Sequence, residues 1–213
     1  MKKITTVILA AGKSSRFKGN KSKIFHDLAG LPIIDHIYNK AKNISGNDIV
    51  FVCNTQNIEL LKKKFPNCKF TLQQKQKGTA DAVLCAKEYI SKNSNVLILF
   101  GDVPLINIKT LKRLSRSYLN NNLYGSILAF ESKNPFAYGR VITNKNKIFE
   151  VVEELNATNE IKKISLCNAG VMITSYNILF KNINKINNKN IKKEKFLPDI
   201  FKILYKENKA FNY

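Results

Sequence analysis

The chain has 213 residues, 44% of them hydrophobic, so it is long enough to bury one substantial core. Its continuous apolar runs fall far short of the roughly 20 residues that span a bilayer, which argues against a transmembrane helix. The formal charge of +21 suggests nucleic-acid binding, but only four of the 36 basic residues are arginine, and the lysines are spread along the whole chain. Base readout favours arginine, and single-strand grooves favour interleaved aromatic residues. We therefore expect neither a nucleic-acid partner nor a membrane partner.

The first half of the chain alternates short apolar runs with amphipathic stretches. This pattern predicts strands over residues 4–10, 48–53, 68–73 and 96–100, and helices over 32–43, 56–64, 79–91 and 108–120. In the helix expected at 79–91, the apolar residues that share one face are Ala82, Val83, Ala86 and Ile90. Such alternation is typical of a Rossmann-like α/β fold, in which a mostly parallel, mixed sheet carries helices on both faces. Ligands then bind beyond the carboxyl ends of the strands.

The second half is richer in predicted strands and is expected to form a sugar-facing lobe. These strands cover residues 124–131, 139–143, 148–153 and 170–174, and a last helix is expected over 198–206. Residues 182–195 are rich in lysine and asparagine, which indicates a solvated loop or helix face rather than a binding tract.

The four cysteines give no sign of a metal site or of disulfide bonds. They form no Cys-x-x-Cys pair and have no clustered histidines nearby. Reduced thiols fit a cytoplasmic protein. His26 and His36 are interpreted as structural residues, because neither has an evident catalytic partner in the sequence.

The turn that follows the first predicted strand is suited to binding a phosphate. The apolar run over residues 6–11 leads into Gly12, Lys13, Ser14, Ser15 and Arg16. Small residues with backbone donors and nearby positive charge can hold an anionic group. The spacing excludes a P-loop, because Val7 stands where that motif needs its first glycine. It also excludes the dinucleotide fingerprint, because Ser14 and Phe17 stand where later glycines would fall.

The extended segment resembles the signature of the sugar-1-phosphate nucleotidylyltransferases. The resemblance is strongest to the pyrophosphorylase domain of bacterial N-acetylglucosamine-1-phosphate uridylyltransferase. It rests on several motifs that occur in the family order between residues 4 and about 205: LAAGKSSRF (9–17), KIFHDLAGLP (23–32), LQQKQKGTADA (72–82), FGDVPL (100–105), YGR (138–140), VEE (152–154) and NAG (168–170). Each motif alone is weak, and the ordered series is specific.

The resemblance implies transfer of UMP from UTP to a sugar 1-phosphate, giving a UDP-sugar, expected to be UDP-N-acetylglucosamine, and pyrophosphate. Two polyanions must meet in this reaction, so charge neutralisation and alignment are needed rather than a covalent nucleophile. Arg16 is expected to act toward the leaving pyrophosphate and Lys23 toward the phosphates near the reacting centre. Asp102 follows a predicted strand at the ligand edge and is expected to hold Mg²⁺.

The resemblance also assigns the remaining binding residues. The base is expected to contact the backbone of Leu9, Ala10, Ala11 and Gly12, together with Gln73, Gly78 and Thr79. The Gln73 amide offers both a donor and an acceptor, Gly78 permits a close backbone approach, and Thr79 can also act as a helix N-cap. The substrate-binding set is Phe100, Gly101, Gly139, Glu153 and Asn168.

The sequence departs from the pattern of its nearest relatives in several places. Ser14 replaces a usual glycine, Phe100 a tyrosine, Ala169 a threonine and Leu155 a lysine. A second metal-binding asparagine of those relatives lies further along than residue 213, and we expect no counterpart here of their β-helix acetyltransferase domain.

We therefore expect a single nucleotidylyltransferase domain over residues 1–213. Residues 1–120 would form its nucleotide-binding half and residues 121–213 a sugar-binding half that is truncated at the C-terminus. Two alternatives remain open at this point. One is a related CTP- or GTP-dependent transferase with another acceptor, and the other is a catalytically weak nucleotide-binding remnant. The oligomeric state is not readable from the sequence.

Overall fold

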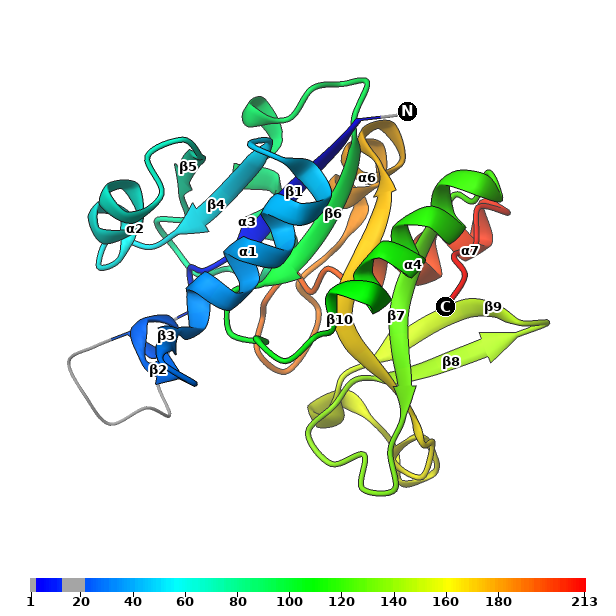
Figure 1. Ribbon diagram of the computed structural model, residues 1–213. Coiled ribbons are helices and arrows are strands. Elements are labelled where there is room, and N and C mark those ends of the chain that lie inside the picture. The colour runs from blue at the N-terminus through cyan, green and yellow to red at the C-terminus, as the bar shows by residue number, and fades with distance from the viewer. Residues whose placement is uncertain (1–2, 13–21) are drawn as a thin grey trace.

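A computed structural model describes residues 3–12 and 22–213, and one eight-stranded sheet runs through it (Figure 1). The strands are β1 (Ile4–Leu9), β4 (Ile49–Cys53), β5 (Lys69–Leu72), β6 (Asn95–Phe100), β7 (Gly125–Glu131), β8 (Arg140–Asn144), β9 (Lys147–Val152) and β10 (Leu166–Ser175). The order is β5-β4-β1-β6-β10-β8-β9, and β7 pairs with the other side of β10. A small separate hairpin joins β2 (Asp27–Leu28) to β3 (Leu31–Pro32).

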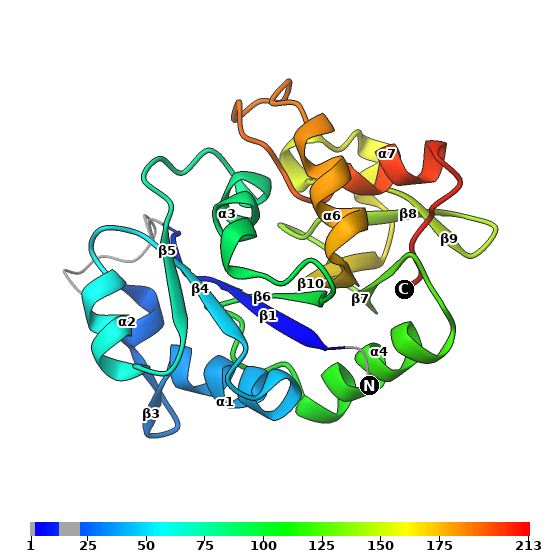
Figure 2. The same ribbon diagram turned by 90° about the horizontal axis from the view of Figure 1, so that it is seen from above.

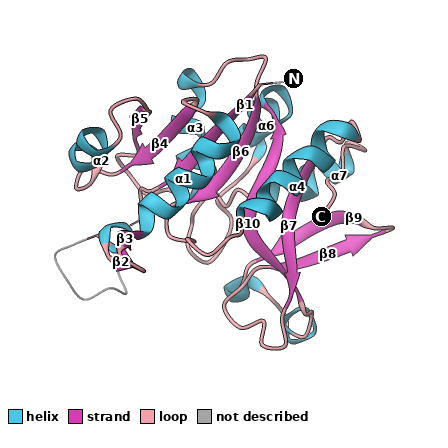
Figure 3. Ribbon diagram, in the orientation of Figure 1, coloured by secondary structure: helices cyan, strands magenta, loops and turns pink. Residues whose placement is uncertain are grey.

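The sheet is parallel on one side and antiparallel on the other. Strands β5, β4, β1 and β6 are parallel, whereas β10 runs antiparallel to β6 and β7 runs antiparallel to β10. Strands β8 and β9 form an antiparallel hairpin that extends away from the parallel strands (Figure 3). Its two turn residues, Lys145 and Asn146, both have positive φ, as a tight hairpin turn requires. The mixed α/β fold expected from the sequence is confirmed.

Helices cover both faces of the sheet, as Figure 2 shows from above. On one face lie α1 (Ile33–Ser45), α2 (Ile58–Lys64) and α4 (Ile108–Asn120), and on the other lie α3 (Thr79–Cys85), α6 (Tyr176–Asn182) and α7 (Asp199–Lys206). Successive β1 residues alternate between the two cores, with Ile8 on the α1 side and Val7 and Leu9 on the α3 side. The β1 strand is therefore buried on both faces.

The remaining elements are short. They are the 3₁₀ turns η1 (Lys23–Phe25), η2 (Lys87–Tyr89), η3 (Glu154–Asn156) and η4 (Ile183–Lys185), and the helix α5 (Asn159–Lys162). Within the described residues, no helix combines the length and the apolar character needed to cross a membrane.

The helix predicted over residues 79–91 is too long. It ends at Cys85, because the Cys85 carbonyl accepts a hydrogen bond from the Thr71 hydroxyl of β5 at 3.0 Å and the chain tightens into η2. The predicted apolar face is nevertheless buried, since Ala82, Val83, Ala86 and Ile90 are at most 5% exposed. The helix predicted over residues 108–120 matches α4 at both ends, and the other predicted elements of the first half differ from the structure by at most two residues at an end.

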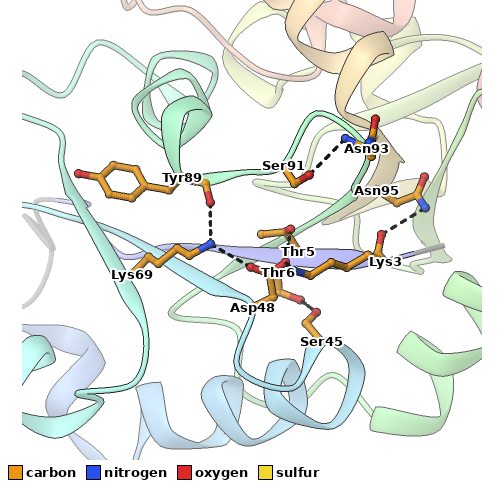
Figure 4. A network of polar contacts seen from close by, with 10 residues as sticks. All are labelled: Lys3, Thr5, Thr6, Ser45, Asp48, Lys69, Tyr89, Ser91, Asn93 and Asn95. Atoms are coloured by element: carbon orange, nitrogen blue, oxygen red, sulfur yellow. Dashed lines mark hydrogen bonds and ion pairs between the residues drawn. The ribbon is translucent and has the colours of Figure 1, made fainter. Parts of the chain in front are cut away.

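A polar network joins three strands at the end of the sheet opposite the carboxyl ends of the parallel strands (Figure 4). The Thr5 hydroxyl donates to Asp48 at 2.7 Å. The ammonium groups of Lys3 and Lys69 lie 3.3 and 3.2 Å from the Asp48 carboxylate. Burial acts to raise the pKa of Asp48, but the hydrogen bonds from Thr5 and Lys69 outweigh it and hold this pKa below its ordinary value. Asp48 therefore stabilises the fold as a carboxylate.

Replacing this carboxylate should destabilise the protein. Asp48→Ala leaves the Thr5 hydroxyl without its acceptor and removes the ion pair with Lys69, so we expect the free energy of unfolding at pH 7 to fall by about 1–3 kcal/mol in urea titrations. The pKa of Asp48 is lower in the folded than in the unfolded protein. Its stabilising contribution is therefore present above the unfolded pKa of about 3.9 and is lost as the pH falls through the folded pKa. The difference between the two proteins should therefore narrow below about pH 4.

Glu59→Ala is the matched control for that measurement. It removes a carboxylate whose ion pair with Lys62 is exposed and only three residues apart, so we expect a change within about 0.5 kcal/mol. Equal losses in the two variants at pH 7 would contradict the role assigned to Asp48.

Candidate functional site

The turn after β1 presents hydrogen-bond donors to the ligand edge of the sheet. The carbonyl groups of its first three residues are engaged: that of Leu9 accepts from Gly101 N at 2.9 Å, that of Ala10 from Asn57 Nδ2 at 2.8 Å, and that of Ala11 from Asn54 Nδ2 at 3.3 Å. Within the described part of the chain, the N–H groups of Ala11 and Gly12 make no hydrogen bond. The described turn therefore suits an anionic or hydrogen-bond-accepting ligand.

Asn54 and Asn57, which sequence reasoning did not single out, hold this turn in place. Both lie between β4 and α2 and are buried, with exposed fractions of 6% and 0%. They also bond each other, because Asn57 Oδ1 accepts from Asn54 N at 3.1 Å and Asn54 Oδ1 accepts from Asn57 N at 3.1 Å. The only sequence signal is a pair of asparagines three residues apart at a strand-to-helix junction.

Lys23 and Asp102 lie together at the same edge. Lys23 begins η1 and Asp102 follows β6, and the Lys23 ammonium lies 3.1 Å from Asp102 Oδ2. Both side chains remain accessible, with exposed fractions of 35% and 42%. Lys40 of α1 donates to the Pro104 carbonyl at 2.8 Å, which fixes the loop that carries Asp102. Arg16, the other predicted cation, lies outside the described residues.

Gln73 and Gly78 also lie at this edge. Their contacts differ in part from those predicted from the sequence, because some of them are made within the protein. Gln73 is 4% exposed, and its Nε2 donates to the Gly78 carbonyl at 3.1 Å and to Asp81 Oδ2 at 2.8 Å. The amide donors that were predicted to be available to a base are therefore engaged within the protein. Its amide oxygen makes no hydrogen bond to any described residue.

A segment that is distant in sequence crosses the start of α3. Residues 194–197, here called the crossing segment, bond to the chain around Gly78: Lys195 N donates to the Lys77 carbonyl at 2.8 Å, and Ala80 N donates to the Lys195 carbonyl at 2.9 Å. Leu197 N donates to the Thr79 hydroxyl at 2.8 Å. Residue 195 of the lysine-rich tract, predicted to be only a solvated face, is therefore a structural contact of the nucleotide half.

These contacts also explain Gly78 and Thr79. Gly78 is the N-cap of α3 and has φ of 110°, and a Cβ built on it would lie 2.4 Å from the Lys195 carbonyl oxygen. The close approach predicted at this glycine is thus made by the chain's own backbone. Thr79 is not the N-cap, because it is the first residue of the helix, and its hydroxyl accepts a hydrogen bond from Leu197 N.

Gly139, Glu153 and Asn168 come together in the second half. Asn168 N donates to the Gly139 carbonyl at 2.9 Å, and a Cβ built on Gly139 would lie 3.3 Å from Glu153 Oε1. Beside them Arg140, 1% exposed, pairs with Glu154 at 2.6 Å. The hydrogen bond from Arg140 lowers the pKa of Glu154. The Arg140 ion pair thus fixes the backbone next to Gly139.

Phe100 joins the two groups of residues. Gly170 of β10 has φ of 77°, and a Cβ built on it would lie 2.9 Å from the Phe100 ring. The same glycine donates its N–H to Asn168 Oδ1 at 3.0 Å. Phe100 is followed directly by Gly101 and Asp102, so the Asp102 edge and the Asn168 group are continuous. Phe100 of the first half is therefore linked to Asn168 of the second half through Gly170.

Glu153 has an unusual electrostatic environment. Burial raises its pKa, the negative charge of Asp199 raises it further, and Lys192 opposes them. Asp199, at the start of α7, also has a raised pKa because of burial and the nearby Glu150. Sequence reasoning did not identify Asp199 as part of this group.

The family model described as MobA-like NTP transferase domain matches residues 6–166 of this chain. The chain belongs to this family. Curated relatives of this chain include the bifunctional protein GlmU of Thermosipho melanesiensis, 41% identical over 198 residues, and that of Buchnera aphidicola subsp. Schizaphis graminum, 36% identical over 208 residues. The aligned regions cover 92% and 97% of this chain but 43% and 45% of those proteins, so the chain spans less than half of their length.

A solved structure shares the fold. UDP-glucose pyrophosphorylase complexed with UDP-glucose superposes with a TM-score of 0.76 over 97% of this chain and 88% of that one. The sequences are 16% identical, so this likeness concerns the fold alone. The family match confirms the expectation of a nucleotidyltransferase-type domain, and the shared fold confirms the expected α/β architecture.

Substituting Gly78 should detach the crossing segment. Gly78→Ala places a methyl group against the Lys195 backbone and forces an unfavourable φ, so we expect a loss of about 1–3 kcal/mol in unfolding free energy and faster tryptic cleavage between residues 189 and 195. Gly46→Ala is the control, because Gly46 also has positive φ but nothing within 4 Å of a built Cβ. Equal cleavage rates of the two variants between residues 189 and 195 in native buffer would show that the contact with Lys195 is not the reason why position 78 requires glycine.

The pKa of Glu153 should respond to its neighbours in opposite directions. Asp199→Asn removes a negative charge and should lower this pKa, whereas Lys192→Met removes a positive charge and should raise it. Titration of the Glu153 carboxyl carbon by NMR measures both shifts. An unchanged midpoint in both variants would show that burial alone sets the value.

Proposed function

We propose that this protein is a sugar-1-phosphate nucleotidyltransferase that transfers UMP from UTP to N-acetylglucosamine-1-phosphate, releasing pyrophosphate. The observation that supports it most is the continuity of the site. A donor-rich turn and a cation lie at one end, a group of amide and carboxylate side chains at the other, and Phe100 against Gly170 between them. The curated relatives that the chain matches are GlmU proteins, which supports this substrate pair.

In this reaction an oxygen of the sugar phosphate attacks the α-phosphorus of the nucleotide, and the bond to the β-phosphate breaks. The protein aligns two polyanions and neutralises their charge. Lys23 is the described donor for the phosphates, Arg16 is proposed for the leaving pyrophosphate, and the N–H groups of Ala11 and Gly12 are proposed to contact the base. Glu153 and Asn168 are proposed to bind sugar hydroxyl and acetamido groups, for which carboxylate and amide groups are suitable partners.

Asp102 is the residue proposed to hold Mg²⁺. One of its carboxylate oxygens pairs with Lys23, and the other makes no hydrogen bond to a described residue. The described chain contains no group of three or more His, Cys, Asp or Glu side chains placed to hold a metal ion. A single accessible carboxylate fits Mg²⁺, which commonly uses one or two carboxylates together with substrate phosphates and water. When bound, the ion would offset the negative charge of the triphosphate.

The activity assay is release of pyrophosphate with magnesium across a panel of triphosphates and sugar phosphates. We expect turnover with UTP and N-acetylglucosamine-1-phosphate, and at least a hundredfold loss, on the order of that seen for other electrostatic catalytic groups, in Asp102→Ala and Arg16→Ala. Both variants should keep the wild-type circular dichroism spectrum. Full activity in either variant would overturn its assigned role.

The same panel separates the alternatives. Turnover with CTP or GTP and another acceptor would assign the protein to a related transferase. Nucleotide binding without turnover would identify a binding protein that has lost the transfer activity.

A further inference from the structure

The polarity of the Gln73 amide is fixed by its surroundings. Its Nε2 lies 2.8 Å from Asp81 Oδ2 and 3.1 Å from the Gly78 carbonyl oxygen. Both of these atoms accept hydrogen bonds and neither donates, so the end of the amide that faces them must be the NH₂ group. The reversed amide would place Oε1 against a carboxylate and a carbonyl, which is repulsive.

The groups that fix the amide are themselves anchored. Gln73 N donates to the Cys53 carbonyl at 2.8 Å, which continues the pairing of β5 with β4. Asp81 lies in the first turn of α3, where Ala80 N is bonded to the crossing segment. Turning the Gln73 amide by 180° would therefore break both of its hydrogen bonds, because the anchored neighbours cannot move to replace them.

The oxygen of this amide has no hydrogen-bond partner among the residues that the structure describes. Gln73 is 4% exposed, and within the described residues its Oε1 makes no hydrogen bond. The atom is not among the fully buried unpaired polar atoms, so a ligand at the surface of the site can reach it. A polar side chain that is more than nine-tenths buried and keeps one accessible acceptor is suited to selecting a ligand with a donor.

We infer that Asp81 is a specificity-determining positioning residue, which makes Gln73 an obligate hydrogen-bond acceptor and so selects uracil over cytosine. This rests on the proposed function, in which Gln73 contacts the base. Uracil carries a ring N–H between two carbonyl oxygens, whereas cytosine has an unprotonated acceptor nitrogen at that place. The N–H groups of Ala11 and Gly12 at the same sheet edge make no hydrogen bond to a described residue, and they suit the uracil oxygens.

The variant Asp81→Asn tests this inference. Its side-chain amide can donate to Gln73 as well as accept from it, so both orientations of the Gln73 amide become possible. We expect the ratio of kcat/KM for UTP to that for CTP to fall about tenfold, the effect of losing one oriented hydrogen bond. Asp81→Ser, whose hydroxyl also donates and accepts, should change the ratio in the same direction. If one of these two variants does not fold, the other still allows the ratio to be measured.

The control is Glu88→Gln, which removes one negative charge at an exposed position of η2. It should keep the wild-type ratio. A residue with only a structural role would lower kcat/KM for UTP and CTP together, so an unchanged ratio in Asp81→Asn and Asp81→Ser overturns the inference while the proposed function stands.

Binding measurements separate this inference from the proposed function. If the wild-type protein releases no pyrophosphate from UTP, the proposed function is overturned, and calorimetric titration with UMP and CMP then decides the inference. A preference for UMP that falls about tenfold in Asp81→Asn supports it, since both nucleotides carry the same phosphate. Equal affinities of the wild-type protein for UMP and CMP overturn it.

Discussion

The pairing of β6 with β10 is the interaction on which the candidate site depends. The parallel strands alone would end in an edge that carries the donor turn, Gln73 and Asp102 but no residue of the second half. Because β10 runs antiparallel to β6, its first residues lie at that same edge and bring Asn168 beside Phe100. Gly170 makes this possible, since its left-handed backbone and missing side chain leave room for the Phe100 ring.

The electrostatic character of the site comes from the orientation of its polar groups rather than from the total charge of the chain. A formal charge of +21 is distributed over the surface, whereas the turn after β1 becomes a donor surface because Asn54 and Asn57 take up its carbonyl groups. A free carbonyl at this position would repel a phosphate oxygen. The opposite end of the site contains Glu153, whose raised pKa reflects burial and the nearby Asp199.

The sequence predicted the elements of the parallel half well and the contacts between distant segments poorly. Strands such as β1 and β6 are continuous apolar runs, and the period of α4 is regular, so local pattern is sufficient there. The crossing segment has no such signal. It meets the chain at Gly78, more than a hundred residues earlier, through backbone groups that every residue possesses. Lysine and asparagine composition correctly indicated a loop there but could not indicate its contact.

The sequence by itself determined the α/β fold, the family and the order of the site residues, because apolar periodicity and motif spacing are properties of neighbouring residues. Only the tertiary structure decided how those residues are used. It showed that the nitrogen of Gln73 is committed to Asp81, and that Gly78 is required by the Lys195 backbone. It also placed Asn54 and Asn57 against the turn after β1. Hydrogen-bond partners that are distant in the chain depend on how strands and loops pack, and that packing leaves no local pattern in the sequence.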